Sequence, residues 1–371
     1  MRSQFTREQQ TGKLVAKAVR DLAIVGGGPA GATCAAFAAA AGLDVVVLER
    51  AKFPREKVCG DCLNPECWPI LRRLGLEERV RTSTHAALEA VEFVSLRGKR
   101  VVVPLPPKAE IAIKRSILDA LLLEKAAAAG SEVQEEVTVT HVRRTNEYWM
   151  IKSGTGAEVC ARLLVAADGR NSTVARLLGL LHHGSRERVA LQAHIPLPPA
   201  FGRRVVLQWR PQGYSGQAPV SESELNLCLV GRAKDISELQ AWAANAFHLP
   251  PAQKWRTITP LARATLAPAQ QNLLLAGDVA RVVEPFTGEG IYYAMRSGEL
   301  AAECAQDMLR GEPVAGARHY ADAHAALYRG RLWINALTRA AVVSPVIGSS
   351  ILELARFQPA LLRTLTRKIV R

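Results

Sequence analysis

The sequence lacks the features typical of disulfide-rich, secreted and nucleic-acid-binding proteins. The seven cysteines are scattered and odd in number, which favours a reducing compartment over a disulfide framework. No apolar segment of signal-peptide type follows Met1, and residues 1–20 form a polar, basic arm. Aromatic residues make up only 5% of the chain and we find no nucleic-acid-binding module. The net charge of +14 therefore does not indicate a nucleic-acid partner.

Acidic residues are nearly absent from the C-terminal segment 329–371, where Glu353 is the one acid. The uncharged run from Ala340 to Leu352 contains Pro345 and is too short to cross a bilayer. Apolar residues around it recur at helical spacing, so we expect a basic amphipathic helical tail. Two interpretations stay open: the tail lies on an anionic membrane surface, or it packs over the core with its arginines in water. We expect a cytoplasmic protein, with peripheral membrane association under the first interpretation.

The strongest motif is a glycine-rich turn between two short apolar runs, at residues 22–25 and 45–48. The pattern G-x-G-x-x-G falls on Gly26, Gly28 and Gly31. The first glycine permits a tight turn, the second a close approach of pyrophosphate, and the third the packing of a helix on the sheet. The amides and dipole of that helix attract phosphate, and Glu49 ends the second run, where a ribose is bound. The sequence therefore predicts a dinucleotide site.

The loop after Glu49 is basic and contains clustered cysteines. Arg55 or Lys57 in this loop faces either phosphate or water. The spacing of Cys59, Cys62 and Cys67 resembles a metal motif, but no histidine lies near, so we expect no metal site. Alternatively, Cys59 and Cys62 form a redox-active pair.

Two further turns follow predicted buried strands, and each contains an adjacent aspartate and glycine. They are Asp168-Gly169 and Gly277-Asp278. The carboxyl ends of strands in α/β sheets are the places where such folds bind ligands. Beyond the second turn, Gly288 and Gly290 put bare backbone at the start of a long helix, whose amides can face a reduced flavin. NAD would need only the first motif, so the combination favours a flavin dinucleotide.

With these motifs established, the chain resembles the geranylgeranyl reductase family of FAD-dependent oxidoreductases, within the p-hydroxybenzoate hydroxylase-like superfamily. The resemblance rests on GGGPAG, FPREKVCGD, AADGRNSTVARLLG and LLLAGDVARVVEPFTGEGIYYAMRSGELAA, at residues 26–31, 53–61, 166–179 and 273–302. It implies an α/β fold: a Rossmann-like FAD-binding domain of the p-hydroxybenzoate hydroxylase type, an inserted and mainly antiparallel β-sheet substrate domain, and a helical C-terminal tail.

The expected division of the chain follows from these motifs and from the strand patterns between them. We assign residues 1–20 to the basic arm, 21–84, 111–184 and 266–328 to the FAD-binding domain, 85–110 and 185–265 to the substrate domain, and 329–371 to the tail. Within the FAD-binding domain, residues 133–142 are predicted to form a strand.

The resemblance implies which residues contact FAD. They are Gly26, Gly28, Pro29, Ala30, Gly31, Glu49, Arg50, Cys59, Gly60, Arg115, Asp168, Gly169, Gly277, Asp278, Pro285, Gly288, Glu289, Gly290 and Ile291. By this resemblance, the glycines of the first motif cradle the pyrophosphate and Asp278 binds ribityl or pyrophosphate groups. Residues 285–291 are expected to line the isoalloxazine. No second nucleotide motif is present, so NAD(P)H or another reductant is expected to act only as a transient electron donor.

Three functions stay open. The preferred one is hydride transfer between flavin N5 and an apolar prenyl, quinone or polyketide-like substrate, with Cys59, Tyr214 or Tyr292 as proton donor. The second is an NAD(P)H-dependent monooxygenase that hydroxylates an aromatic or polyketide substrate. The third is a membrane-associated FAD electron carrier. Relatives carry G-Y-x-W-x-F-P where this chain has Gly216 and Ala218 in place of two aromatics, so we expect a reshaped substrate pocket.

Overall fold

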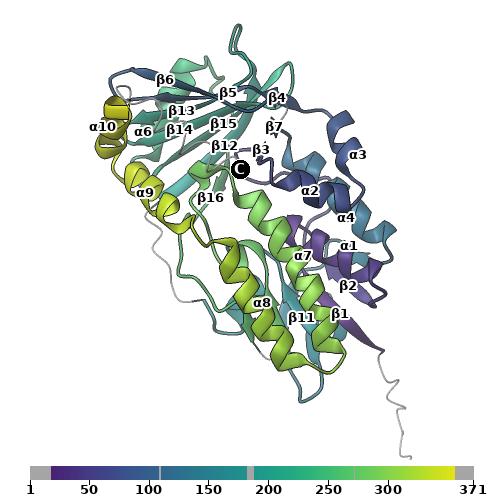
Figure 1. Cartoon of the computed structure of the whole chain (residues 1–371). Helices are drawn as coiled ribbons and strands as arrows, with labels where there is room; N and C mark the ends of the chain where they lie inside the picture. Colours follow the sequence, from purple (N-terminus) through teal and green to yellow (C-terminus); the bar gives the residue numbers. More distant parts are fainter. Residues whose placement is uncertain (1–17, 108–109, 182–187, 271, 356–371) are drawn as a thin grey trace, which may run out of the picture.

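The structure is a computed structural model that describes residues 18–107, 110–181, 188–270 and 272–355 (Figure 1). Two large sheets and one small sheet form its framework, and the helices α1, α4, α7 and α8 lie along the first of them. The predicted division between an α/β part and a mainly antiparallel part is confirmed at the level of fold class. The exact domain bounds given above stay predictions.

The first sheet has eight strands and is parallel at its centre. Its main path is β17 (Ala269–Gln270), β18 (Leu273–Leu275), β11 (Glu158–Ala166), β1 (Val19–Val25), β2 (Val45–Leu48) and β8 (Glu132–Gln134), and β10 (Trp149–Ser153) and β9 (Val139–Arg144) extend it beside β11. Strand β2 is buried at all four positions. Because helices and strands cover both faces, such central strands are continuous apolar runs, as the sequence predicts. The carboxyl ends of β18, β11, β1 and β2 consequently meet at one edge.

Strands β8 and β9 differ from the prediction of one strand over residues 133–142. Strand β8 ends at Gln134 and β9 begins at Val139. Between them Glu136 has a φ of 62°, in the left-handed region. That conformation breaks an extended strand, and a Glu gives little sequence signal for it.

Helices α1 (Pro29–Ala40), α4 (Arg115–Ala128) and α7 (Gly290–Leu309) pack together, with α1 in contact with both others. Helix α8 (Pro313–Leu327) packs on α7 (Figure 1). A Cβ at Gly298 would lie 2.2 Å from the carbonyl oxygen of Ala30. Helices α1 and α7 thus approach at backbone distance, which fixes the start of α1 relative to the long helix.

The second sheet has seven strands and is antiparallel except where β5 and β13 run parallel. Its order is β16 (Arg256–Ile258), β12 (Arg188–Pro196), β15 (Glu224–Arg232), β14 (Gly213–Pro219), β13 (Arg204–Arg210), β5 (Ala90–Val94) and β6 (Arg100–Pro104). Helix α6 (Ile236–Ala246) contacts β15. A three-stranded sheet lies between the two large ones, in the order β3 (Cys62–Leu63), β7 (Glu110–Ala112) and β4 (Ala86–Leu88). The short helices are α2 (Cys67–Arg73), α3 (Glu77–Thr82), α5 (Thr173–Leu177), η1 (Gly277–Val279) and η2 (Pro285–Thr287).

The C-terminal helices α9 (Leu332–Val343) and α10 (Pro345–Ala355) run along the second sheet (Figure 1). Trp209 of β13 donates its indole N–H to the carbonyl oxygen of Ala341 at 3.1 Å, and Val342 is buried. The predicted tail is therefore helical and packed over residues 332–355, and its remainder lies outside the described residues. Taken singly, none of the described helices is both long and apolar enough to cross a membrane; α9 and residues Pro345–Glu353 meet that measure only as a pair bent by 112°.

Candidate functional site

A cavity of about 510 Å³ lies between the first and second sheets. The turn after β1 and the ends of β2, β11 and β18 all line one end of it. These strands are neighbours in the sheet, which explains why turns near residues 28, 168 and 278 meet at one place. The arrangement is the ligand-binding edge of an α/β sheet.

Each glycine of the first turn is required for a different structural reason. Gly26 has a φ of 104°, and a Cβ there would lie 2.6 Å from the carbonyl oxygen of Ala167. A Cβ at Gly31 would lie 1.8 Å from the carbonyl oxygen of Gly26, so Gly31 serves helix packing and does not line the cavity. Gly28, Pro29 and Ala30 do line it. The turn thereby presents backbone, without side chains, at the start of α1.

The start of α1 fits a diphosphate. Gly28 is the N-cap residue, its cap has no side-chain hydrogen bond, and the first turn of the helix contains no acid. The first amides of α1 are therefore available to an anion. A guanidinium nitrogen of Arg55 would lie 3.4 Å from a Cβ at Gly28, which puts positive charge beside these amides.

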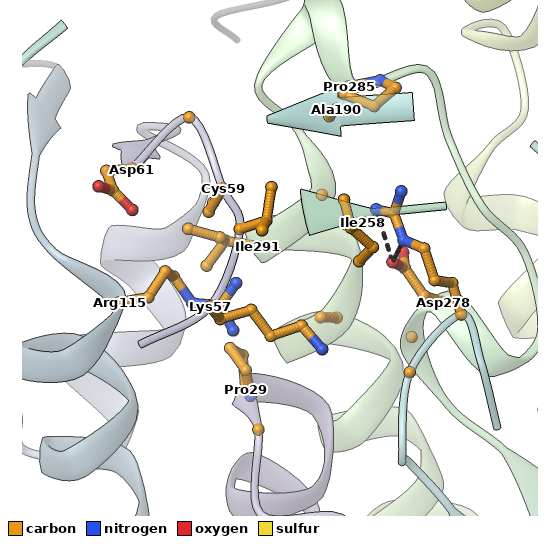
Figure 2. A pocket seen from close by; sticks show the side chains of 18 of the residues that line it. Pro29, Lys57, Cys59, Asp61, Arg115, Ala190, Ile258, Asp278, Pro285 and Ile291 are labelled. Carbon is orange, nitrogen blue, oxygen red and sulfur yellow. Dashed lines mark hydrogen bonds and ion pairs between the residues drawn. The ribbon is translucent and has the colours of Figure 1, made fainter. Parts of the chain in front are cut away.

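Lys57 adds a second cation to this end of the cavity. Figure 2 shows its side chain extended across the pocket, between Pro29 and the pair of Cys59 and Ile291. Burial, together with the nearby charges of Arg115 and Arg55, lowers the pKa of Lys57 to about 8. Within the described residues Lys57 makes no ion pair, so a bound anion would supply its missing counter-charge.

Arg115 begins α4 and is held rigidly. It donates two hydrogen bonds to Asp119, at 2.7 and 2.8 Å, and Arg55 lies 3.1 Å from the same carboxylate. Burial opposes the charge of Arg115, but Asp119 more than offsets it and raises the pKa of Arg115. The guanidinium therefore stays charged at the cavity wall, close to Cys59.

The three carboxylates at the strand ends are not equivalent. Glu49 accepts hydrogen bonds from the amides of Gly27 and Ala51, at 2.7 and 2.8 Å. Asp168 accepts from the hydroxyl of Ser172 and the amide of Thr173, both at 2.6 Å, so it mainly organises the start of α5. These contacts fix each carboxylate, and unused lone pairs of Glu49 can still accept from ribose hydroxyls.

Asp278 is partly exposed, with 27% of its side chain accessible. Its carboxylate pairs with Arg170 at 3.1 Å and lines the cavity (Figure 2). Gly277, just before it, has a φ of 61° and donates its amide to the hydroxyl of Ser297 at 2.8 Å. This bond ties the turn to α7 and aims Asp278 at the cavity.

Pro285 of η2, Gly288 and the first residues of α7, Gly290 and Ile291, line the cavity. That they contact the isoalloxazine stays a prediction. The N-cap of α7 lacks a side-chain hydrogen bond and its first turn has no acid, so its amides too are available. Arg50, Gly60 and Gly169 also line the cavity.

Two predicted site residues of this segment do not line the cavity. Glu289 is buried and accepts from Arg331, and Tyr293 donates its hydroxyl to it at 3.3 Å. Tyr292 packs against the ring of Tyr293, at a centroid distance of 5.3 Å. The structure therefore does not bring Tyr292 to the site as a proton donor. Helix periodicity turns residues 289 and 292 away from the face that residues 290 and 291 present.

The other two predicted proton donors do line the cavity. Burial raises the pKa of the Cys59 thiol, and the pKa of Tyr214 lies well above its ordinary value, chiefly through burial. Both groups are therefore protonated at neutral pH. Cys59 and Cys62 are free cysteines, so no disulfide joins them. Among the described residues no group of His, Cys, Asp and Glu is arranged to hold a metal ion.

Sequence reasoning missed a polar network beneath the Cys59 loop. The Nε2 atom of His194 lies 2.8 Å from Oδ2 of Asp61 and 3.2 Å from the side-chain nitrogen of Gln192. Asn226 donates to the carbonyl oxygen of Cys59 at 2.8 Å. The only sequence signal was Asp61 at the end of FPREKVCGD, because His194 lies in an ordinary strand pattern.

The far end of the cavity is apolar and comes from the second sheet and η2. Its lining includes Val91, Phe93, Val205, Leu207, Tyr214, Val230, Ile258, Leu261 and Phe286. The rings of Tyr214 and Phe286 pack edge to face at a centroid distance of 5.2 Å. Gly216 and Ala218 line the same wall, so the absence of two aromatic side chains leaves room beside this apolar end.

Comparison with known proteins agrees with this geometry. A family model described as FAD binding domain matches residues 20–213. Menaquinone reductase of Mycolicibacterium smegmatis is 33% identical, over 76% of this chain and 75% of the relative. Digeranylgeranylglycerophospholipid reductase 1 of Methanothermobacter thermautotrophicus is 26% identical, over 77% and 76%. The structure of a probable FAD-dependent monooxygenase from Pseudomonas aeruginosa has a TM-score of 0.75 at 20% identity, over 91% of this chain and all of that one, and shows the fold alone. The chain belongs to the FAD-binding-domain family, as an FAD-dependent oxidoreductase of the geranylgeranyl and menaquinone reductase type.

Proposed function

We propose that this chain is a reductase that transfers hydride between FAD and an apolar prenyl or quinone-like lipid. The observation that carries the proposal is the two-part cavity. Its charged, glycine-rich end fits the diphosphate and ribityl groups, and its other end is lined by apolar side chains from the second sheet. When bound, FAD supplies the hydride chemistry, and the chain orients the substrate and excludes water.

The names of the relatives support the substrate class. They are reductases of menaquinone, of digeranylgeranylglycerophospholipid and of geranylgeranyl diphosphate. These substrates combine an extended apolar chain with a polar head. The apolar end of the cavity, with room beside Gly216 and Ala218, suits such a chain better than it suits a small aromatic acid.

We further propose that the outer surface of α9 and α10 docks on an anionic membrane. Most of the exposed large apolar side chains in the described residues belong to these helices: Leu332, Trp333, Leu337, Val343, Val346, Ile347 and Ile351. Arg329 and Arg339 are exposed nearby, and the sequence beyond residue 355 contains five basic residues and no acid. Apolar side chains beside excess positive charge suit the interface of an anionic bilayer.

An anaerobic turnover experiment tests the proposed reaction. The FAD-loaded protein is reduced by light or dithionite and mixed, without oxygen, with a menaquinone or a geranylgeranyl lipid. We expect the flavin to be reoxidised and a product two hydrogens heavier than the substrate to form. Reoxidation only in the presence of oxygen, with an oxygenated product, would instead identify a monooxygenase. Failure to reoxidise with any lipid or oxygen would favour a redox-silent FAD-binding protein.

The electron donor is tested separately, because the described residues include no second nucleotide motif. We propose a reduced nicotinamide that binds transiently. Stopped-flow reduction of the oxidised protein by NADPH and by NADH should bleach the flavin absorbance at a rate that saturates with one of them. A rate that neither nucleotide raises above the buffer control would exclude a nicotinamide donor.

A further inference from the structure

Glu110 is a buried carboxyl group in the wall of the cavity. It begins the central strand of the three-stranded sheet, β7, and its side chain is almost completely buried, with 8% of the residue exposed. Its Oε2 atom has no hydrogen-bond partner among the described residues. A buried polar atom without a partner costs free energy, so such a group in a cavity wall points to a ligand.

The other buried acids of the described chain show how unusual this is. Each of them has at least one partner: Glu49 has backbone amides, Asp61 has His194, Glu92 has Arg100, Asp119 has Arg115, Glu284 has Arg188, Glu289 has Arg331, and Glu299 has Arg73. Among the buried carboxyl groups that the structure describes, Glu110 alone makes no hydrogen bond or ion pair. Burial without a partner favours the neutral form of a carboxyl group over its charged form.

Among the residues that the structure describes, the neighbours of Glu110 contribute no charge. Strand pairing puts Leu88 opposite Glu110, and Cys62 opposite Ala112, two positions further along β7. Because side chains alternate along a strand, Glu110, Cys62 and Leu88 share one face of this sheet. The ionisable groups that the carboxyl influences are the thiols of Cys62 and Cys67, and the pKa of each is raised, chiefly by burial. Burial raises the pKa of Glu110 itself to about 7.

This face of the small sheet lies between the two ends of the cavity. On one side, the Cβ atom of Cys62 would lie 3.9 Å from a Cβ at Gly288, in the segment expected to line the isoalloxazine. On the other side, Leu88 and Ala112 pack in one cluster with Val91 and Val205 of the apolar end. A substrate that reaches from the apolar end towards the flavin would pass Glu110.

We propose that Glu110, as a neutral carboxylic acid, donates the proton that accompanies hydride transfer to the substrate. The inference rests on the proposed reductase function. With bound reduced FAD as the source of a hydride for one carbon of a carbon–carbon double bond, the O–H of Glu110 would give its proton to the other carbon. The double bond becomes single, two C–H bonds form, and Glu110 is left as a carboxylate. Solvent would return the proton to Glu110 after product release, and the reduced nicotinamide would supply the two electrons and the proton needed for the next turnover.

The protonation of Glu110 is measured first, by infrared spectroscopy of the oxidised, FAD-loaded protein. A neutral carboxylic acid has a C=O stretching band that a carboxylate lacks. We expect such a band below pH 7, lost on raising the pH with a midpoint near 7, absent from E110Q and retained in E89Q. Glu89 is a matched control, because it lies next to Leu88 and forms an exposed ion pair with Arg203. A band that E110Q leaves unchanged, or its absence from the wild type, would overturn the proposal.

Single-turnover kinetics then test the role of the group. In E110Q we expect flavin content and nicotinamide-driven reduction to match the wild type, and lipid-driven reoxidation to slow by at least about 100-fold. E110D should recover part of the rate. In the wild type this rate should fall as the pH rises through 7, and in E110Q it should not. Equal reoxidation by E110Q and wild type would overturn the role of Glu110 alone, whereas failure of every lipid with the wild type would overturn the reductase function too.

Discussion

The Oδ2 atom of Asp61 lies 2.8 Å from the Nε2 atom of His194, although the two residues are far apart in the sequence. The contact joins the loop that contains Cys59 and Gly60 to strand β12 of the second sheet. Both side chains are nearly inaccessible to water, so the bond is made in a medium of low polarity. The position of the loop that contains Cys59 therefore depends on a residue of the second sheet.

Removing the histidine should destabilise the protein measurably. His194→Phe leaves the Asp61 carboxyl buried without its partner, and we expect a loss of about 3 kcal/mol in the free energy of unfolding. His194→Gln keeps a donor and should lose less than half of that. Urea unfolding followed by circular dichroism gives both values. If the two variants lost the same amount, the hydrogen bond would not be the source of the effect.

The third glycine of the first turn is expected to be indispensable. In Gly31→Ala the added methyl would meet the carbonyl oxygen of Gly26 at 1.8 Å, so α1 must shift away from the strand. We expect at least about a tenfold weaker affinity for FAD and a lower midpoint of thermal unfolding. Gly154→Ala is the control, since its nearest contacts would be an ordinary 3.7 and 3.8 Å. FAD titration of the apoprotein, followed by fluorescence quenching, compares the two.

Lys57 should make FAD binding depend on pH. A diphosphate beside Lys57 favours the charged amine, so binding raises a pKa that lies near 8 in the free site. By linkage, the affinity for FAD should fall as the pH rises through 8 and above, by about tenfold. Lys57→Met should bind FAD more weakly at pH 7 and lose this dependence. Calorimetric titrations at pH 7 and pH 9 test it, and Lys52→Met, an exposed residue of the same loop, should behave as the wild type.

Glu110 should also make the stability of the folded protein decrease as the pH rises. Its pKa is raised to about 7 in the folded protein, from 4.5 for an unperturbed glutamate. The folded state therefore binds this proton more tightly than the unfolded state does. As the pH rises from about 4.5 to 7, Glu110 progressively lowers the free energy of unfolding. E110Q cannot ionise. We expect it to be more stable than the wild type at pH 8 and nearly equal at pH 5, in chemical unfolding of the FAD-loaded protein. A difference that does not depend on pH would exclude ionisation as its cause.

The proposed membrane surface is tested with charges placed on it. Val346 and Ile347 of α10 are 67% and 50% exposed, so V346D/I347D should fold normally. We expect its binding to vesicles of phosphatidylglycerol and phosphatidylcholine to fall by about tenfold, because aspartate disfavours both the apolar interface and anionic lipid. Val314→Asp, at a residue of α8 that is 73% exposed, is the control. If V314D reduced cosedimentation with the vesicles as much as V346D/I347D does, the net charge of the protein, and not the surface of α9 and α10, would govern membrane binding.

The sequence predicted well what depends on local chemistry. Local patterns were sufficient for the turn at Gly26 and Gly28 and for the buried strand β2, because a glycine-rich turn and a short apolar run are each typical of one element of an α/β sheet. The meeting of distant turns followed from the rule that ligands bind at the carboxyl ends of such strands. His194 and Glu110 could not be predicted, because their significance lies in what surrounds them. His194 acquires its partner from a distant loop, and Glu110 has no partner among the described residues because the cavity wall around it is apolar.

Helix α9 packs behind the apolar end of the cavity and also forms part of the outside of the molecule. Val342 packs in one cluster with Tyr214, Ala190 and Leu261, which line the cavity, while other residues of the helix face outward. The cofactor end shares none of its strands with this region. Under the proposed function, substitutions in α9 that shift these lining residues would change the shape of the apolar end and leave the strands of the glycine-rich end unchanged. This offers evolution, or a protein engineer, a route to new specificity.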